Sequence, residues 1–461
     1  MTVKEYHQRR ELLSKKVEKG IILLLANKIL PRNYAANALP FRQDSTFLYY
    51  SGIEIPELVL IIDCDRGETI LAGNEPTVED AVWSGPQTSM KELAERVGIG
   101  ETLPAGQLKK TIESFRAGKR KIHYLPPYTA ERKILLSELL GIPVQRIAEE
   151  VSADLIEAVI EQRSVKSTSE IAEIESVIDL VTGPMHENAM IMAVDGNYEY
   201  QVVAEMYRIV KANNLDFAFP VICSVHGEVL HNESHINRLQ NGQLLLVDAG
   251  VESINHYASD ITRTTPVGGR FSPRQKEIYE IVLGAQLNAV KNLRPGLRYI
   301  DVHLEAARYI ANGLKMLGLM SGNSDEAVQE GAHALFFPHG LGHMMGLDVH
   351  DMEDLGENRV GYDMHISRSK QFGTAYLRLA KALKPGYVLT IEPGIYFIPA
   401  LIEQWQAQKK HREFINYNAI KEYMNFGGIR IEDNVAITAS GSRILGNPIA
   451  KTIDEIQAKF R

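Results

Sequence analysis

Four acidic residues in the second half of the chain have sequence settings that suit metal-dependent hydrolysis. Each lies in or directly beside a run of apolar residues typical of a buried strand; they are Asp248, Asp260, Glu392 and Glu432. A lone buried carboxylate is costly, so any one of them alone would be interpreted as a turn residue. If the four converge, their charges repel one another and need compensation, which two divalent cations would supply.

Three histidines, His339, His343 and His350, lie within a short glycine-rich string. The spacing of the first two is that of a helical zinc pair, but the glycines between and after them disfavour a helix, and the H-E-x-x-H motif is absent. Four carboxylates with one imidazole form an oxygen-rich site, which favours Mn or similar ions over a thiolate-type zinc site. Two such ions roughly 3.5–4 Å apart can share a hydroxide that is a nucleophile at neutral pH.

The strand pattern predicts how two of the acids meet. Asp248 ends the apolar run 243–248, and Asp260 lies in the Thr- and Ile-rich run that follows. The segment between them is short enough for a hairpin. A hairpin would place both carboxylates on adjacent strands.

The other two acids follow later strands. Glu392 ends the apolar run 388–392 and precedes a Pro-Gly turn. In the strand-like run 428–435, Arg430 and Glu432 alternate with isoleucines, so both charged side chains share one face.

The elements form two groups, which predicts two domains. Residues 1–160 alternate as in an α/β domain, with helices expected at 5–17, 91–97 and 130–140 and strands at 21–26, 47–53, 58–62 and 69–71. A helical linker at 153–162 and 169–192, with an N-cap at 167–169, leads into the second domain, 165–461. That domain combines its strands with long helices at 272–293 and 299–317.

The composition is that of a globular protein. The 461 residues carry a formal net charge of -8, which gives no hint of the basic face of a nucleic-acid binder. The N-terminal residues lack the apolar centre of a signal peptide, and the apolar run 21–26 is far shorter than the ~20 residues of a membrane helix. Two cysteines, Cys64 and Cys223, do not make a disulfide framework. We therefore expect a cytoplasmic protein that binds neither nucleic acid nor membrane.

The order Asp248, Asp260, His343, Glu392, Glu432 resembles the five-ligand signature of the pita-bread metallopeptidases, which include methionine aminopeptidase, aminopeptidase P and prolidase. The resemblance implies two bound divalent metal ions, with Mn favoured and Co, Zn or Fe as alternatives. One departure is that the two aspartates are twelve positions apart, one more than usual. We place the extra residue in the turn at 251–256, because an extra residue within a strand would turn Asp260 to the wrong face.

Further strings resemble the proline-specific branch of that family. Gly-Glu-Val-Leu-His-Asn at 227–232 is similar to the segment with the first active-site histidine, here His231. The string that contains His339 and ends in Val-His-Asp is similar to one shared by aminopeptidase P and prolidase. Segments 41–47 and 82–85 resemble pieces of a creatinase-type N-terminal domain. The implied fold is an α/β creatinase-like N-terminal domain followed by an α+β pita-bread catalytic domain.

Two features favour an Xaa-Pro dipeptidase within that branch. Arg378 lies in a segment that resembles the one with which prolidases grip the substrate's terminal carboxylate, and a guanidinium can bind a carboxylate bidentately. The segment 399–424 is long, as it is in prolidases. The alternative is an Xaa-Pro aminopeptidase acting on longer peptides. A metal-free binding module or a creatine-hydrolysing relative is disfavoured, because neither has an electrostatic reason to keep clustered carboxylates.

The resemblance also implies roles for the catalytic residues. Glu392 would take a proton from the attacking hydroxide and pass it toward the leaving nitrogen. His231 and His350 would orient the scissile carbonyl and the proline and stabilise the tetrahedral intermediate.

Two further residues would support the site. Arg430 would hold Asp260 or Glu432 in place, or reach the proline carboxylate. His339 would shape the proline pocket. The implied substrate is a small peptide with proline in its second position, and the implied assembly is a homodimer or homotetramer in which Trp83 contacts a neighbour's site.

Overall fold

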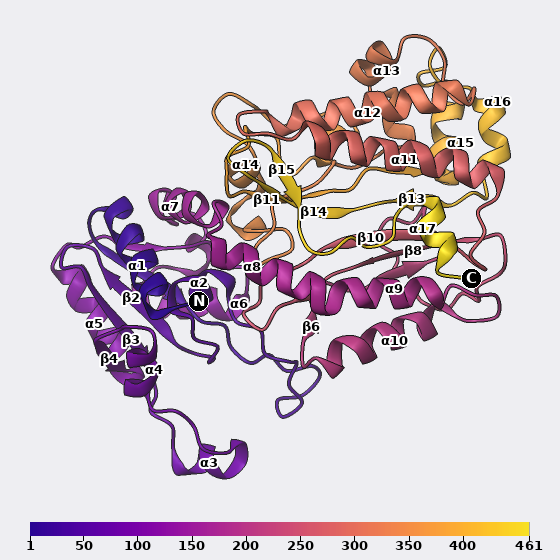
Figure 1. The fold of residues 1–461 in the computed structure, drawn as a ribbon. Coiled ribbons are helices and arrows are strands. Elements are labelled where there is room, and N and C mark those ends of the chain that lie inside the picture. Colours follow the sequence, from indigo (N-terminus) through magenta and orange to yellow (C-terminus); the bar gives the residue numbers. More distant parts are fainter. Residues whose placement is uncertain (461) are drawn as a thin grey trace. The chain divides into compact units, whose positions relative to one another are not determined.

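Two units make up the computed structural model, which describes residues 1–460 (Figure 1). The first unit contains Met1–Arg163 together with Asp354–Gly356, and the second contains Ser164–Glu353 and the chain from Glu357 onward. Among the described residues, no helix is both long enough and apolar enough to cross a bilayer.

The first unit is built on a mixed sheet with the strand order β4-β3-β2-β1-β5. Strand β1 pairs antiparallel with β2 and parallel with β5, and its five apolar residues are all buried. The strands are β1 Ile21–Leu25, β2 Val59–Asp63, β3 Glu68–Gly73, β4 Glu101–Pro104 and β5 Ile122–Tyr124. The helices are α1 Val3–Val17, α2 Ser45–Ser51, α3 Val78–Ser84, α4 Met90–Arg96, α5 Ala105–Ala117, α6 Ala130–Leu140 and α7 Ala153–Ser164.

The strand predicted at 47–53 is wrong, because this segment is the helix α2. The side chain of Asp44 caps the helix by accepting a hydrogen bond from the backbone N–H of Phe47, and Gly52 ends it in the left-handed conformation. Every residue of α2 is buried. Its polar residues are buried together with its apolar ones, so the sequence shows neither helical nor strand periodicity and the pattern could not separate the two.

The second unit combines long helices with short antiparallel strands. Its helices are α8 Thr168–Val177, α9 Gly183–Ile191, α10 Glu199–Ala212, α11 Pro273–Asn292, α12 Tyr299–Met316, α13 Ser324–Glu330, α14 Glu357–Gly361, α15 Pro399–Ala407, α16 Tyr417–Ile420 and α17 Ile453–Ala458. Its strands are β6 Asp216–Phe217, β7 Ile222–Ser224, β8 Leu244–Ala249, β9 Val251–Glu252, β10 Ile261–Pro266, β11 Val388–Ile391, β12 Gly394–Tyr396, β13 Gly428–Arg430, β14 Asp433–Ile437 and β15 Ser442–Ile444.

The strands of the second unit lie between two layers of helices (Figure 1). Strands β8, β10, β13 and β14 have α9 and α10 on one side and α11 and α12 on the other. The main sheets have the orders β10-β8-β7 and β11-β14-β15, and β12 pairs with β13. The expected α/β first domain and α+β second domain are therefore both present.

The predicted linker helix and one predicted strand differ in detail from the structure. The helix begins at the predicted N-cap, where the Ser167 side chain accepts a hydrogen bond from the N–H of Glu170, and it continues through a π-helical turn at Ile178–Thr182 into α9. The run 428–435 is not one strand but two, β13 and β14. Glu432 lies at the break, where its N–H donates to the carbonyl oxygen of Thr262 on β10.

Candidate metal centre

The hairpin expected between the two aspartates is present. Strands β8 and β10 pair antiparallel with Asp248 opposite Thr262, and Asp260 directly precedes β10. The connection turns at Ser253, whose N–H donates to the carbonyl oxygen of Tyr257 over 2.9 Å. Both aspartates are buried, with exposed fractions of 9% and 5%. Asp260 faces the site in spite of the unusual spacing, because its Oδ2 atom lies 3.4 Å from Nε2 of His343.

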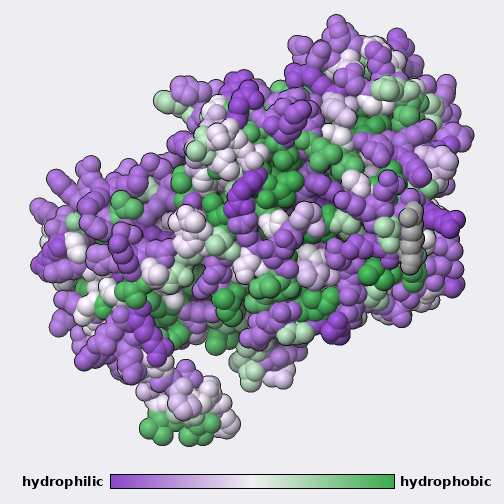
Figure 2. Space-filling view, in the orientation of Figure 1, coloured by the Kyte–Doolittle hydropathy of each residue, from purple (hydrophilic) through white to green (hydrophobic). Residues whose placement is uncertain are grey.

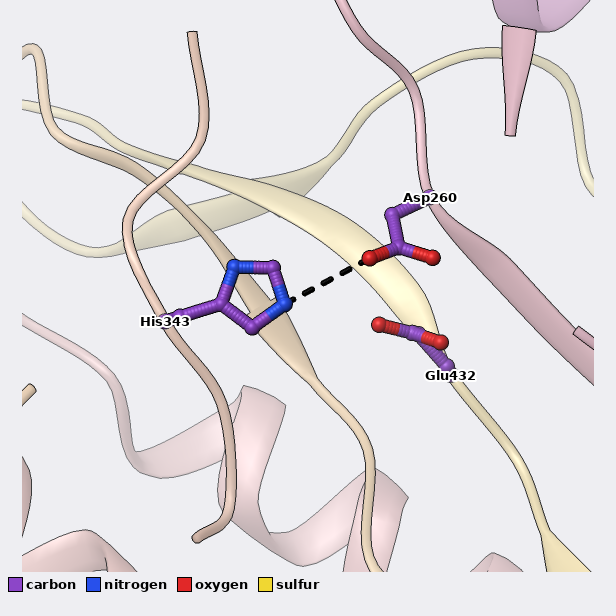
Figure 3. Close-up of side chains that lie close together, drawn as sticks. All are labelled: Asp260, His343 and Glu432. Atoms are coloured by element: carbon purple, nitrogen blue, oxygen red, sulfur yellow. Dashed lines mark ion pairs between the residues drawn. The ribbon is translucent and has the colours of Figure 1, made fainter. Parts of the chain in front are cut away.

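The five predicted ligands converge from separate elements. Metal-binding atoms of Asp260, His343 and Glu432 all lie within 4.8 Å of one another (Figure 3). Glu392 directly follows β11, and its Oε1 atom is 3.5 Å from Nε2 of His343. Asp248 completes the group through its place beside Asp260 on the hairpin.

The orientation of His343 indicates what fills the space between it and the acids. The backbone from 338 to 350 is irregular, as the glycines predict. The Nδ1 atom of His343 lies 3.1 Å from the carbonyl oxygen of Met344, which only accepts, so Nδ1 carries the proton. Burial lowers the pKa of His343, so the ring is neutral at pH 7 and the Nε2 lone pair faces carboxylate oxygens of Asp260 and Glu392. A lone pair pointing at anions is the arrangement of a metal ligand.

Hydrogen bonds from the described residues satisfy the acids of the cluster only in part. Within the part of the chain that the structure describes, one buried oxygen each of Asp248, Asp260 and Glu432 accepts no hydrogen bond. Burial raises the pKa values of Asp260, Glu392 and Glu432, and the charges of neighbouring carboxylates raise them further. Bound cations would remove this conflict, since they bind the bare oxygens and balance the charge. The five residues therefore fit a pair of divalent metal ions.

Two threonine hydroxyls position the ligands, and sequence analysis missed both. Thr262 donates through Oγ1 to Oε2 of Glu432 at 2.6 Å. Thr390 donates through Oγ1 to Oε1 of Glu392 at 3.2 Å and accepts from the backbone N–H of His343. The signal was available, because each threonine lies two residues from an acid on the same strand run and so shares its face.

Arg430 contacts a different acid from the two that were expected. Its Nη2 atom donates to Oδ2 of Asp248 at 2.5 Å, rather than to Asp260 or Glu432. Its Nη1 atom donates to the hydroxyl oxygen of Tyr396 at 2.9 Å, and its Nε atom to Oγ1 of Thr262. The packing of β13 against β10 explains the difference. The N–H of Arg430 donates to Oγ1 of Thr264 on β10, and its guanidinium reaches Thr262 and Asp248 from there.

Tyr396 links Arg430 to His339 and was also missed. The Nδ1 atom of His339 is 2.8 Å from the carbonyl oxygen of Gly340, so Nδ1 carries the proton. Burial lowers the pKa of His339 to about 3, so the ring is neutral. Its Nε2 atom therefore accepts from the Tyr396 hydroxyl, which lies 2.8 Å away. The hydroxyl is thus fully used, and it fixes the His339 ring in the pocket wall.

All the predicted site residues line one pocket of about 640 Å³. His231, His339, His350 and Arg378 form its polar wall beside the metal ligands. The remainder is mostly apolar, with Phe219, Ile222, Leu230, Val349, Phe372, Tyr376, Ile398 and Leu401. Leu401 belongs to α15, so the long segment at 399–424 contributes to the wall.

Two glutamates, Glu353 and Glu357, pair with polar residues of this wall. The Nδ1 atom of His350 pairs with Oε2 of Glu353 at 2.8 Å, and the ring lies against His343 with centroids 4.4 Å apart. Arg378 forms an ion pair with Glu357, and its Nη2 atom lies 3.6 Å from Oε2 of Glu353. Arg378 is thus in the pocket, but with its guanidinium against two carboxylates.

The chain matches known protein families over most of its length. The profile of Metallopeptidase family M24 matches residues 178–439, which is more than half of the chain, and that of the Aminopeptidase P N-terminal domain matches residues 6–123. The chain belongs to metallopeptidase family M24. This confirms the predicted pita-bread family, its two-domain fold class and the metallopeptidase activity.

Relatives of this M24 metallopeptidase match it along almost its whole length. The Xaa-Pro aminopeptidase of Escherichia coli is 28% identical and covers 98% of this chain and 97% of its own. A probable Xaa-Pro aminopeptidase of Aspergillus niger is 31% identical, over 95% and 92% of the two chains. These names agree better with the alternative activity considered from the sequence than with the favoured dipeptidase.

Solved structures give the same family picture. The aminopeptidase PepP of Pseudomonas aeruginosa superimposes with a TM-score of 0.83 at 28% identity, covering 100% of this chain and 98% of its own. A zinc-substituted aminopeptidase P of Escherichia coli in complex with product gives a TM-score of 0.82 at 28% identity, with the same coverage.

Proposed function

We propose that this M24 metallopeptidase is an Xaa-Pro aminopeptidase that releases the N-terminal residue from peptides with proline in second position. The observation that carries the proposal is the convergence of five metal-binding side chains in one pocket with His231, His339 and His350. The near full-length relatives named Xaa-Pro aminopeptidase support the substrate class.

Two divalent metal ions would be held by Asp248, Asp260, His343, Glu392 and Glu432, and Mn is the ion we favour because oxygen ligands dominate. When bound, such ions supply a nucleophile at neutral pH and polarise the substrate carbonyl. Zinc, cobalt or iron would suit the same ligands.

Glu392 is the proposed proton carrier of the reaction. A carboxylate within reach of the attacking water can accept its proton and then give it up. Thr390 holds Oε1, and Nδ1 of His339 lies 3.9 Å from Oε2. We propose that Glu392 takes the proton of the attacking water and passes it to the proline nitrogen. That nitrogen has no hydrogen of its own in the substrate and must gain one to leave.

The two remaining histidines divide the work of holding the substrate. Burial lowers the pKa of His350 to about 4, and its Nδ1–H donates to Glu353, so its Nε2 atom is an acceptor at neutral pH. His231, whose pKa is also lowered by burial, is then the imidazole that can donate to the carbonyl oxygen and to the tetrahedral intermediate. Arg430 keeps Asp248 in place, and His339 shapes the wall against which the pyrrolidine ring lies.

A homo-oligomer in a reducing, cytoplasmic setting is part of the proposal. Helix α3 exposes an apolar group made by Val78, Val82 and Trp83, with exposed fractions of 83%, 73% and 80% (Figure 2). Exposed apolar groups of this kind mark interaction surfaces, and a second copy of the chain is the partner we propose. Free thiols at Cys64 and Cys223 support a reducing compartment.

Hydrolysis by purified protein reloaded with Mn tests the proposed activity, with Ala-Pro-Ala, Ala-Pro and Ala-Ala-Ala as substrates. We expect release of alanine from Ala-Pro-Ala, slower cleavage of Ala-Pro and no cleavage of Ala-Ala-Ala. Cleavage of Ala-Pro alone would instead support an Xaa-Pro dipeptidase. Equal cleavage of Ala-Ala-Ala would contradict specificity for proline.

A further inference from the structure

Arg378 is a positive charge in the wall of the substrate pocket. It lines the pocket beside His343 and His350, and its side chain is 32% exposed. A guanidinium in this position could bind the terminal carboxylate of an Xaa-Pro dipeptide, because that carboxylate lies one residue from the scissile bond.

Two glutamates already engage that guanidinium. Glu357 pairs with Nη1 of Arg378, and Glu353 lies near Nη2. The second oxygen of Glu357, Oε2, lies 2.7 Å from Nη2 of Arg368, so this carboxylate is fixed between two arginines. Arg368 is itself anchored, because its Nε atom donates to Asn358 at 2.7 Å. Glu357 is therefore held against Arg378 by a third residue.

The charges of this group cancel. Two arginines, Arg368 and Arg378, and two glutamates, Glu353 and Glu357, carry charges that sum to zero. A dipeptide would bring an extra negative charge into a partly buried place where Arg378 is already paired with two glutamates, which is costly. A longer peptide places an uncharged peptide group at the same position.

We propose that Glu357 is a positioning residue that determines specificity, because it neutralises Arg378 and thereby sets the preference for peptides longer than a dipeptide. This inference rests on the proposed aminopeptidase function. Glu357 acts through Arg378 and need not touch the substrate. Removing its charge would free Arg378 to bind a terminal carboxylate and would move the enzyme toward dipeptidase activity.

The test compares Ala-Pro with its amide, Ala-Pro-NH2, which differs only in the charge of the terminal group. The quantity measured is the ratio of kcat/KM for Ala-Pro to that for Ala-Pro-NH2, with Mn-loaded full-length enzyme at neutral pH. We expect Glu357→Gln to raise this ratio roughly tenfold, since a hydrogen bond to a charged group is worth about that factor or more. The matched control is Glu403→Gln, which removes the same charge from an exposed position on α15.

A double variant and a single one keep the inference falsifiable. Arg378→Gln combined with Glu357→Gln should return the ratio to the wild-type value, and retention of the gain would overturn the proposal. Arg378→Gln alone should leave the ratio within about twofold of wild type, because the charge is already neutralised. A tenfold fall in that variant would mean that Arg378 already binds the carboxylate and would also overturn it. This single variant decides the matter if Glu357→Gln fails to fold.

If the proposed aminopeptidase function itself is wrong, the outcome differs from that expected if only the role of Glu357 is wrong. In that case the wild-type enzyme hydrolyses none of Ala-Pro-Ala, Ala-Pro and Ala-Pro-NH2. Calorimetric titration of Ala-Pro and Ala-Pro-NH2 into the wild type and Glu357→Gln then decides the inference. A roughly tenfold change in the ratio of their dissociation constants supports it, and an unchanged ratio contradicts it.

Discussion

The Nε2 atom of His343 lies 3.4 Å from Oδ2 of Asp260, with its lone pair directed at the carboxylate. This contact would be repulsive between the two groups alone, because the imidazole is neutral and donates its one proton to the carbonyl oxygen of Met344. A cation between them makes it attractive. The same reasoning extends to Glu392, which lies 3.5 Å from the same nitrogen.

Thr262→Val tests whether the hydroxyl that hydrogen-bonds Glu432 contributes to metal affinity. The change removes the hydrogen bond to Oε2 of Glu432 with almost no change of shape. We expect Mn affinity, measured by calorimetry, to fall by roughly 10- to 100-fold, as it does when ligand-supporting groups are lost. Thr265→Val on the same strand is the control, since its side chain has the opposite direction. Equal affinity in both variants would show that the hydroxyl has no such role.

Tyr396→Phe removes the hydroxyl shared by Arg430 and His339. The His339 ring then loses the donor to its Nε2 atom, and the pocket wall beside the proline loosens. We expect kcat/KM for Ala-Pro-Ala to fall about tenfold, the cost of about one hydrogen bond to a buried group. Tyr279→Phe is a suitable control, because its hydroxyl donates to Lys451 away from the pocket. A loss of the same size in the control would indicate a general effect on stability.

His303 should make the stability of the protein fall in acid. Its ring is fully buried near His333 and His339, and burial lowers its pKa from 6.5 to about 3. Because the pKa of His303 is lower in the folded state, the unfolded state binds the proton at a higher pH than the folded state does. The contribution of the neutral His303 ring to the free energy of unfolding is therefore complete above pH 6.5. It is lost as the pH falls from 6.5 toward 3. The expected loss from this group is about 3 kcal/mol between pH 7 and pH 4.

Urea unfolding of wild type and His303→Leu across that pH range measures this contribution. The variant should lose less stability in acid than the wild type, by the amount above. His365→Leu, at an exposed position, should follow the wild-type curve. Parallel curves for wild type and His303→Leu would refute the assignment.

Trp83→Ser tests the proposed self-association through α3. No residue of α3 is buried, so the substitution should not disturb folding of the chain. We expect light scattering coupled to gel filtration to show a shift from a dimer or tetramer toward a smaller species. Thr69→Ser, in β3 of the same unit, is a conservative control. An unchanged mass for Trp83→Ser would rule out α3 as the interface.

The strand settings of the clustered acids were largely predictable from the sequence, because local patterns determine them. The sequence predicts Asp248 at the end of one strand, Asp260 in the next strand run and a hairpin between them, and the paired strands β8 and β10 form that hairpin. Glu392 was assigned from a strand end before a Pro-Gly turn. These features depend on residues close in the chain, where periodicity and turn chemistry decide the conformation.

The remaining contacts join residues that are distant in the sequence, so local sequence patterns could not predict them. Arg430 pairs with Asp248, which is distant in the sequence, because β13 lies beside β8. The partners of Arg378 lie in the irregular segment and short helix before it, where no period predicts which side chains meet. The helix α2 was missed for a related reason, since its serines and threonine are buried together with its apolar residues and give it no exposed polar face.

The most direct test of the whole account is hydrolysis of Ala-Pro-Ala during titration of metal-stripped protein with Mn. If the five ligands hold two ions that drive cleavage before proline, the stripped protein is inactive and the rate rises until two equivalents are bound. Full activity of the stripped protein, or no cleavage of Ala-Pro-Ala with two equivalents bound, would contradict the central claim.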